Sequence, residues 1–215
     1  MFVLIVDYGS GNIKSVYNSV KKTLQNLNKS SDLKVSSSIL EIKKADKIIL
    51  PGVGSFDQCM KRIRKINGLV ETLNDQIIIR RKPFLGICVG MQILASYGYE
   101  NQMTKGLSWI DGDVKSLKDF IYVSKGLKIP HMGWNNLSVN NKNNLLDNIK
   151  YEDQFYFVHS YFFDIKNKNN IICNTKYGIN IPAIVNEDNI FGFQFHPEKS
   201  GIAGLKILYN WLKLS

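Results

Sequence analysis

The segment Gly86-Ile87-Cys88-Val89-Gly90 has the residue types of a nucleophile on a sharp turn. An apolar run over residues 83–87 precedes the cysteine and a helical pattern follows it, so the turn joins a strand to a helix. Side chains two positions either side of the nucleophile would collide in such a turn, and glycine removes the collision. The cysteine then lies at a helix N-terminus, where the dipole favours a thiolate. The alternative interpretation is a buried cysteine that only packs in the turn.

A cysteine nucleophile needs a base and a group that orients the base, and His196-Pro197-Glu198 offers both. Proline favours extended backbone at the residue before it, and in an extended chain residues two apart point to the same side. We therefore expect His196 and Glu198 to face together. They follow an apolar strand, and catalytic groups of α/β folds collect at strand ends.

The remaining histidines and cysteines lack these surroundings. His131 and His159 have no carboxylate at the same spacing and are interpreted as structural or pocket-lining, while Cys59 and Cys173 have no flanking glycines and are interpreted as core. Three widely separated cysteines fit neither a disulfide framework nor a metal pattern. We expect a reducing, cytoplasmic location, and neither a metal nor another cofactor.

The first half of the chain repeats a strand–turn–helix rhythm. Strands are expected at Phe2–Val6, Lys47–Leu50 and Pro83–Ile87, with helical patterns from Ile13 to Leu24 and over 56–79, the latter interrupted near Asn67-Gly68. This order predicts a parallel sheet with covering helices.

The second half changes character. From Trp109 to Phe195 the apolar runs are β-branched and aromatic, including 155–158 and 190–195, and favour antiparallel strands. A last helix over 202–213 is expected to turn these residues inward: Ile202, Leu205, Leu208, Tyr209 and Leu212. The expected fold class is α/β, an open twisted mixed sheet flanked by helices with a nucleophile elbow, plus added antiparallel β. We expect one domain over residues 1–215.

Composition excludes several other classes. The 215 residues are 44% hydrophobic, too many for a disordered chain. No apolar run approaches the roughly 20 residues of a membrane-spanning helix, and the N-terminus does not resemble a secretory signal. The net charge of +10 raises nucleic-acid binding as an alternative. Basic blocks at 62–65 and 80–82 are better interpreted as solvated helix faces, so we expect neither a nucleic-acid nor a membrane partner.

A dinucleotide-binding module is a second alternative, because Gly9-Ser10-Gly11 follows a strand. Lys14 occupies the position of the third glycine of that fingerprint, and no phosphate-binding P-loop pattern occurs. A third alternative is an inert scaffold that has kept the fold alone. The intact Cys88, His196 and Glu198 count against an inert scaffold.

These motifs together resemble the class I, or triad, glutamine amidotransferases, and within them the family of glutaminase subunits of imidazole glycerol phosphate synthase. The similar segments run in order along the whole chain: Asp7 to Asn12, Pro51 to Gly54, Gly86 to Gln92, Pro130 to Asn135, Phe157 to Tyr161 and Gly192 to Ser200.

The resemblance implies a reaction. Cys88 would attack the side-chain amide of L-glutamine, His196 would transfer the proton to the leaving ammonia, and Glu198 would orient His196. A glutamyl thioester would form and be hydrolysed to glutamate. The oxyanion hole would be the N–H of Val89 together with that of Val53 after a peptide flip, which the neighbouring glycines make inexpensive.

The resemblance also implies binding residues and a partner. Glutamine would be held by Gly52, Gly54, Gln92, Glu100, Ser160 and Tyr161. Ammonia would pass to a (βα)₈-barrel cyclase subunit in a heterodimer, which makes imidazole glycerol phosphate and an aminoimidazole carboxamide nucleotide in histidine biosynthesis. Trp134, Asn135 and Tyr156 would lie on the docking face; the alternative for them is ordinary aromatic core.

Two departures from the family pattern stand out. Val89 replaces the commoner leucine after the nucleophile, a mild change because its N–H does the work. The segment 95–101 is less acidic than the corresponding helix end of the family. The second departure concerns the partner more than the chemistry. It leaves open a paralogous glutaminase subunit that supplies ammonia to another synthase, for instance in amidotransfer to surface-polysaccharide sugars.

Overall fold

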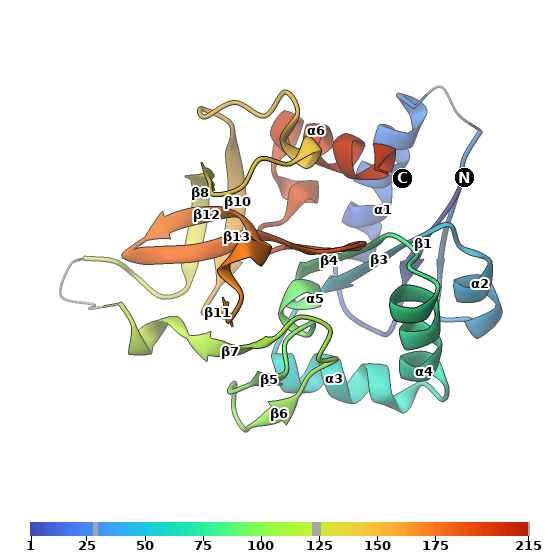
Figure 1. The fold of residues 1–215 in the computed structure, drawn as a ribbon, viewed down its shortest axis with the longest axis horizontal. Helices are drawn as coiled ribbons and strands as arrows, with labels where there is room; N and C mark the ends of the chain where they lie inside the picture. The colour runs from blue at the N-terminus through green and yellow to red at the C-terminus, as the bar shows by residue number, and fades with distance from the viewer. Residues whose placement is uncertain (28–29, 122–125, 215) are drawn as a thin grey trace.

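The computed structural model describes residues 1–27, 30–121 and 126–214, and within them a mixed sheet of eight strands forms the centre (Figure 1). In spatial order the sheet contains β2 (Asp32–Ser36), β1 (Phe2–Val6), β3 (Lys47–Gly52), β4 (Phe84–Cys88), β14 (Ile190–Phe193), β13 (Ile179–Glu187), β12 (Ile171–Tyr177) and β9 (Ser138–Val139). The first five strands are parallel, and β13, β12 and β9 continue the sheet antiparallel. This confirms the mixed α/β architecture that the sequence predicts.

Helices cover both faces of the parallel strands, which explains why β3 and β4 are buried along their whole length and, apart from Lys47, apolar. The α-helices are α1 (Ile13–Gln25), α2 (Ile39–Lys44), α3 (Phe56–Lys65), α4 (Leu69–Asn74), α5 (Val89–Gln92) and α6 (Gly201–Lys213). Figure 1 shows α1 and α6 on one side of the sheet, with α3, α4 and α5 on the other. None of the helices in the described part of the chain has the length and apolarity needed to cross a membrane.

The interruption predicted near Asn67-Gly68 is confirmed. Helix α3 ends at Lys65, and α4 begins after Gly68, whose φ of +74° is the left-handed conformation that glycine adopts at little cost. A π-helical segment, Asp75–Ile79, continues α4. Among the described residues, four short 3₁₀ segments lie at Leu117–Asp119, Asn144–Leu146, Lys168–Asn170 and Pro197–Lys199.

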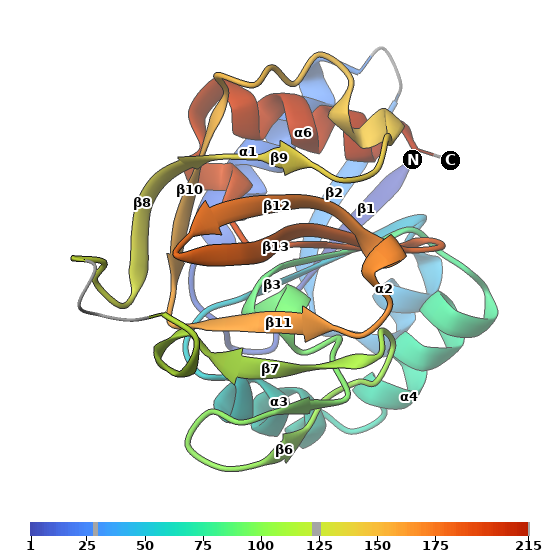
Figure 2. The same ribbon diagram turned by 60° about the vertical axis from the view of Figure 1, so that its left-hand side comes forward.

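Two smaller sheets extend the second half of the chain (Figure 2). One has the order β11 (Tyr161–Ile165), β7 (Gly112–Ser116), β5 (Tyr97–Gly98) and β6 (Thr104–Lys105). The other is the antiparallel pair β8 (His131–Asn136) and β10 (Gln154–His159), whose register places His131 opposite His159. Their pairs are antiparallel except for β5 with β7, which is parallel, so these strands confirm the added antiparallel β apart from that pair.

The prediction of an antiparallel strand over 190–195 is wrong in part. Strand β14 ends at Phe193, pairs antiparallel with β13 and pairs parallel with β4. A strand buried on both faces gives an apolar run in either direction of pairing, so the run could not reveal this central position.

The prediction that Ile202 points inward is also wrong, because its side chain is 74% exposed. The buried face of α6 follows Ala203, Ile207, Leu208 and Trp211. Ile202 lies in the first turn, outside that stripe, and the 100° rotation per residue carries it to solvent. Leu208 and Leu212 are buried as expected, and Leu205 and Tyr209 are half-buried.

Candidate active site

Cys88 is the last residue of β4 and stands directly before α5. Its backbone has φ +55° and ψ −112°, a strained conformation for a residue with a side chain. A Cβ on Gly86 would lie 2.4 Å from the Gly90 carbonyl oxygen, and a Cβ on Gly90 would lie 1.9 Å from the Leu50 carbonyl oxygen. Both flanking glycines are therefore required by close backbone approach, as the nucleophile-elbow pattern predicts.

His196 and Glu198 face each other, with Nδ1 and Oε1 2.8 Å apart. Both side chains are buried. The pair forms by a different local geometry from the extended chain that the sequence suggested. His196 is extended, and a 3₁₀ turn, Pro197–Lys199, then brings the carboxylate back to the ring. The Asn12 amide donates a hydrogen bond to the same carboxylate oxygen from the turn before α1.

The environment of His196 stabilises its charged form. Burial disfavours the imidazolium, but the negative charge of Cys88, a hydrogen bond to its sulfur and the Glu198 carboxylate outweigh burial and raise the pKa of His196 above its ordinary value. The arrangement therefore favours an imidazolium beside Cys88, with a proton that His196 could transfer.

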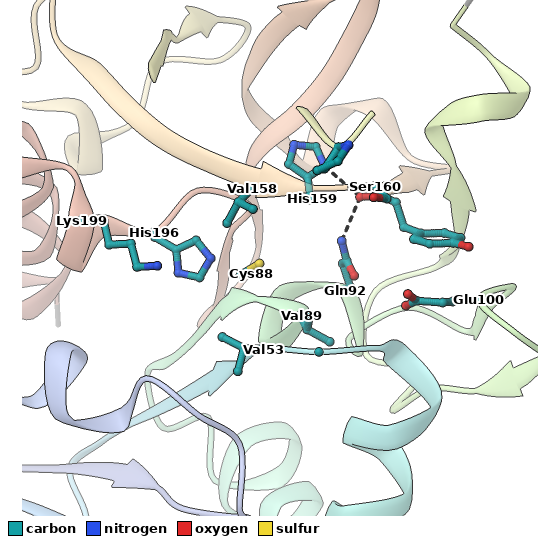
Figure 3. A pocket seen from close by; sticks show the side chains of 13 residues that line it. Val53, Cys88, Val89, Gln92, Glu100, Val158, His159, Ser160, His196 and Lys199 are labelled. Atoms are coloured by element: carbon teal, nitrogen blue, oxygen red, sulfur yellow. Dashed lines mark hydrogen bonds between the residues drawn. The ribbon is translucent and has the colours of Figure 1, made fainter. Parts of the chain in front are cut away.

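These groups open into a cavity of about 350 Å³. Its walls are formed by Val53, Gly54, Cys88, Val89, Gln92, Glu100, Pro130, Val158, His159, Ser160, Tyr161, His196 and Lys199. Figure 3 shows the sulfur of Cys88 in the middle, with His196 on one side and Gln92 and Glu100 on the other. The structure thus brings most of the predicted binding residues together. Gly52 and Glu198 stand outside the lining set; Gly52 packs against the Gly90 backbone, where a Cβ would lie 2.5 Å from the amide nitrogen.

Glu100 supplies the cavity with a carboxylate at the end away from His196. Its Oε2 accepts a hydrogen bond from the N–H of Phe56 across 2.8 Å. Burial raises the pKa of Glu100, while the Phe56 N–H acts in the opposite direction. A half-buried carboxylate with unused acceptor capacity is suited to a cationic group of a ligand.

The predicted oxyanion donors differ in their hydrogen bonding. Val89 begins α5, so its N–H belongs to the helix turn that has no intrahelical partner. The N–H of Val53 instead donates to Ser10 Oγ across 2.9 Å. Ser10 had no assigned role in the sequence, because nothing local links it to a residue 43 positions away. The Val53 N–H can contribute to an oxyanion hole only after its hydrogen bond to Ser10 breaks.

A line of two amides leads from the cavity wall to the sulfur of Cys88. Gln92 Nε2 donates to the Tyr161 carbonyl across 2.9 Å and to Gln194 Oε1 across 3.1 Å. Gln194 Nε2 in turn lies 3.9 Å from the sulfur of Cys88. Gln194 is fully buried, and its place within the His196 motif is the sequence signal that could have identified it.

The other cysteines and histidines agree with their interpretations. Cys59 and Cys173 are buried, and burial raises the pKa of both thiols, that of Cys173 to about 12. His131 and His159 form a buried pair, of which His159 lines the cavity. Across the described ranges, three or more His, Cys, Asp or Glu side chains nowhere gather in a way that could hold a metal ion.

The three residues expected on a docking face lie on β8 and β10. Trp134 and Tyr156 are opposite each other in the register, with ring centroids 5.9 Å apart in an edge-on arrangement. Trp134 is 53% exposed, which excludes aromatic core for its side chain, and its neighbour Met132 is 64% exposed. Lys199 Nζ lies 5.6 Å from the Tyr156 ring centroid and also lines the cavity, so the surface around Trp134 and Tyr156 adjoins the cavity.

Two solved structures with this fold share little sequence with the chain. A protein from Thermoplasma acidophilum, described as part of a GMP synthase, superposes with a TM-score of 0.69 at 17% identity, covering 99% of this chain and 92% of the other. A glutamine amidotransferase from Thermotoga maritima gives 0.67 at 16% identity, covering 99% and 96%. At these identities the likeness establishes the fold alone.

Sequence comparison goes further. Residues 4–214 match the family "Glutamine amidotransferase class-I". The chain is 45% identical to imidazole glycerol phosphate synthase subunit HisH of Pelagibacter ubique over 214 residues, covering 100% of both chains. It is 40% identical to subunit HisH of Brucella suis and 41% identical to subunit HisH 2 of Pseudomonas aeruginosa, covering 99% of each chain. With a cysteine elbow, a histidine–glutamate pair and full-length relatives of one kind, this chain belongs to the class I glutamine amidotransferases.

Proposed function

We propose that this protein is the glutaminase subunit of an imidazole glycerol phosphate synthase, acting in histidine biosynthesis in the cytoplasm. One amidotransferase domain spans residues 1–215. The observation that carries the activity is the placement of Cys88 and His196 in one cavity, with Glu198 hydrogen-bonded to His196 behind the lining and the Glu100 carboxylate at the far end. Relatives from Pelagibacter, Brucella and Rhodospirillum, at 38–45% identity over essentially the whole chain, bear the name of that synthase subunit and support the pathway over the paralogous alternative.

The geometry supports a two-step hydrolysis. The Cys88 thiolate forms a bond to the side-chain amide carbon of L-glutamine, and the C–N bond breaks as His196 donates its proton to the leaving nitrogen, releasing ammonia. His196 then removes a proton from water, which attacks the thioester and releases glutamate and the thiolate. Glu198 holds His196 in the orientation that both transfers need.

Substrate orientation follows from the charges at the ends of the cavity. Glu100 pairs with the α-ammonium of glutamine, and the backbone at Ser160 and Tyr161 receives its carboxylate. The Val89 N–H stabilises the oxyanion. The second donor is the N–H of Val53 after a peptide flip that exchanges its hydrogen bond with Ser10 for one with the oxyanion.

Ammonia is used on another chain. The exposed Trp134, together with the half-buried Asn135 and Tyr156 on the same pair of strands, docks a (βα)₈-barrel cyclase subunit in a one-to-one heterodimer. The cyclase combines ammonia with its nucleotide substrate to give imidazole glycerol phosphate and an aminoimidazole carboxamide nucleotide.

The test uses the complex with its cyclase and two nitrogen sources. Cys88→Ala should abolish glutamine-dependent product formation, a loss of at least about 10³-fold, because the nucleophile is gone. Synthesis from added ammonium salt should persist. Cys173→Ala is the matched control, since this buried thiol lies outside the cavity lining. Full glutaminase activity in Cys88→Ala would exclude the proposed mechanism, and a wild-type complex inactive on the cyclase substrate with either nitrogen source would exclude the proposed pathway.

A further inference from the structure

The carbonyl oxygen of Tyr161 is held by two side chains at the wall of the cavity. Gln92 Nε2 donates to it across 2.9 Å, and His159 Nδ1 lies 2.9 Å away. A carbonyl oxygen only accepts, so His159 Nδ1 must carry a hydrogen. The same Gln92 amide donates to Gln194, which points its own amide at Cys88. The orientation of the Tyr161 carbonyl therefore affects how the Gln92 and Gln194 amides are oriented beside Cys88.

The hydrogen-bond chain can be followed independently from its other end, at Asn135. Its Oδ1 accepts from the Asn136 N–H across 2.9 Å, and its Nδ2 donates to the Lys176 carbonyl across 3.0 Å. These two backbone groups fix which end of the amide is nitrogen. That nitrogen lies 3.3 Å from His131 Nε2, which must accept. The hydrogen of a neutral His131 is then on Nδ1, 3.0 Å from His159 Nε2.

The hydrogen-bond chain gives the same tautomers for both rings whether it is followed from Tyr161 or from Asn135. Each is neutral with its hydrogen on Nδ1, and all four ring nitrogens have partners. A second proton on either ring would set two donors against each other. Burial lowers the pKa of His131 to about 4 and, with the neighbouring ring, that of His159 to about 3, which keeps both neutral. The His131 ring also stacks on Phe157 and Tyr177, with centroids 4.9 Å and 4.0 Å away.

We propose that His131 and His159 are positioning residues of the glutamine site. Oriented by Asn135, the two neutral imidazoles hold the Tyr161 carbonyl, and through it the Gln92 amide, in the arrangement that receives glutamine. This inference rests on the proposed glutaminase function. A pair that served only packing would contribute to stability without setting the affinity for substrate.

The first test reads the ring tautomers in the unaltered chain by long-range ¹H–¹⁵N NMR of ¹⁵N-labelled protein. Both rings should carry their hydrogen on Nδ1, the less common tautomer of a free imidazole. Asn135→Asp replaces the donor facing His131 by an acceptor and should place a hydrogen on His131 Nε2. Asn136→Asp, one residue along the same strand, should leave both rings unchanged. A hydrogen on Nε2 of either ring in the wild type would overturn the proposal.

The second test compares His159→Asn with His159→Leu in the complex with the cyclase. The two replacements have nearly the same size and both remove the contact with His131. Only the asparagine places an amide N–H where Nδ1 lies, within reach of the Tyr161 carbonyl. The KM for glutamine should rise roughly fivefold more in His159→Leu than in His159→Asn, about the worth of one neutral hydrogen bond, with kcat less affected.

The outcomes separate the two proposals. Equal KM values in both variants would assign the pair to packing and overturn the positioning role, even with normal wild-type turnover. A wild-type complex that releases no glutamate from glutamine would overturn the proposed function itself. The tautomer measurement decides the orientation of the rings in either case, because it needs no turnover.

Discussion

Two buried histidines line the same cavity, and their pKa values are shifted in opposite directions. His196, after β14, has a raised pKa, whereas His159, at the end of β10, has a pKa lowered to about 3. Burial acts in the same sense on both, because it disfavours any imidazolium. The difference comes from their partners. His196 lies beside Cys88 and the Glu198 carboxylate, whereas His159 is hydrogen-bonded to a neutral ring and a backbone carbonyl, and the charge of His196 lowers the pKa of His159 further.

The comparison shows how one cavity separates two uses of the same residue type. A histidine between two anions carries a proton that it can give away, as transfer to a leaving group requires. A histidine with no anionic partner stays neutral and keeps one donor and one acceptor in fixed directions. Charge on the partners, rather than depth in the molecule, therefore predicts which histidine does chemistry.

Removing the negative charge of Glu198 should have the largest effect on the difference between the two histidines. Glu198→Gln keeps a group of similar shape but loses the charge, so glutaminase kcat should fall by about 10²–10⁴-fold. Steady-state assays of the complex measure the change. Glu187→Gln, at a glutamate on β13 bonded to Asn170, should leave kcat within about twofold, the small effect expected of a substitution remote from the site. A Glu198→Gln enzyme with wild-type kcat would show that the carboxylate does not orient the base.

Removing the Cys88 sulfur should shift the pKa of His196 downward, toward that of His159. After burial, which opposes charge, the charge of Cys88 is the strongest influence on His196 and the main one that raises its pKa. In Cys88→Ala the pKa of His196 should therefore fall below its wild-type value, and NMR titration of the ring can follow it. The Cys173→Ala chain serves as the control. An unchanged titration would mean that Glu198 alone sustains the imidazolium.

The smallest expected effect is on stability in mild acid. Because the folded-state pKa of His159 lies below the ordinary 6.5, the unfolded chain binds the proton first, and stability falls as pH decreases below about 6.5. Between pH 7 and pH 5 the wild type should lose about 2 kcal/mol more of its unfolding free energy than His159→Leu. Urea unfolding of each chain at both pH values measures this difference in unfolding free energy. The His159→Asn chain should match His159→Leu here, although their KM values differ, and equal losses in wild type and variants would contradict a neutral buried ring.

Much of the site could be predicted because its constraints are local. The elbow needs small residues two positions from Cys88, and the sequence shows Gly86 and Gly90 there. His196 and Glu198 are two residues apart, so their pairing required no knowledge of the rest of the chain, although its 3₁₀ geometry differed from expectation. The apolar runs of β1, β3 and β4 likewise indicated buried strands.

Contacts between distant residues could not be predicted in this way. Asn12 meets Glu198 across 186 positions, Gln92 meets Gln194 across 102, and Val53 meets Ser10 across 43. Each depends on how the elements pack rather than on any neighbour in the sequence. Asparagine, glutamine and serine side chains are common in loops and surfaces, so their types alone carried no signal.

The sequence by itself determined the proposed nucleophile, the proposed base with its orienting carboxylate, and the rhythm of the parallel sheet, because sterics and spacing within a few residues specify them. Only the tertiary structure decided that β14 pairs parallel with β4, that His131 and His159 share a hydrogen bond, and which buried histidine is charged. The physical reason is that pairing direction, tautomer and charge depend on partners that folding brings together from separate parts of the chain.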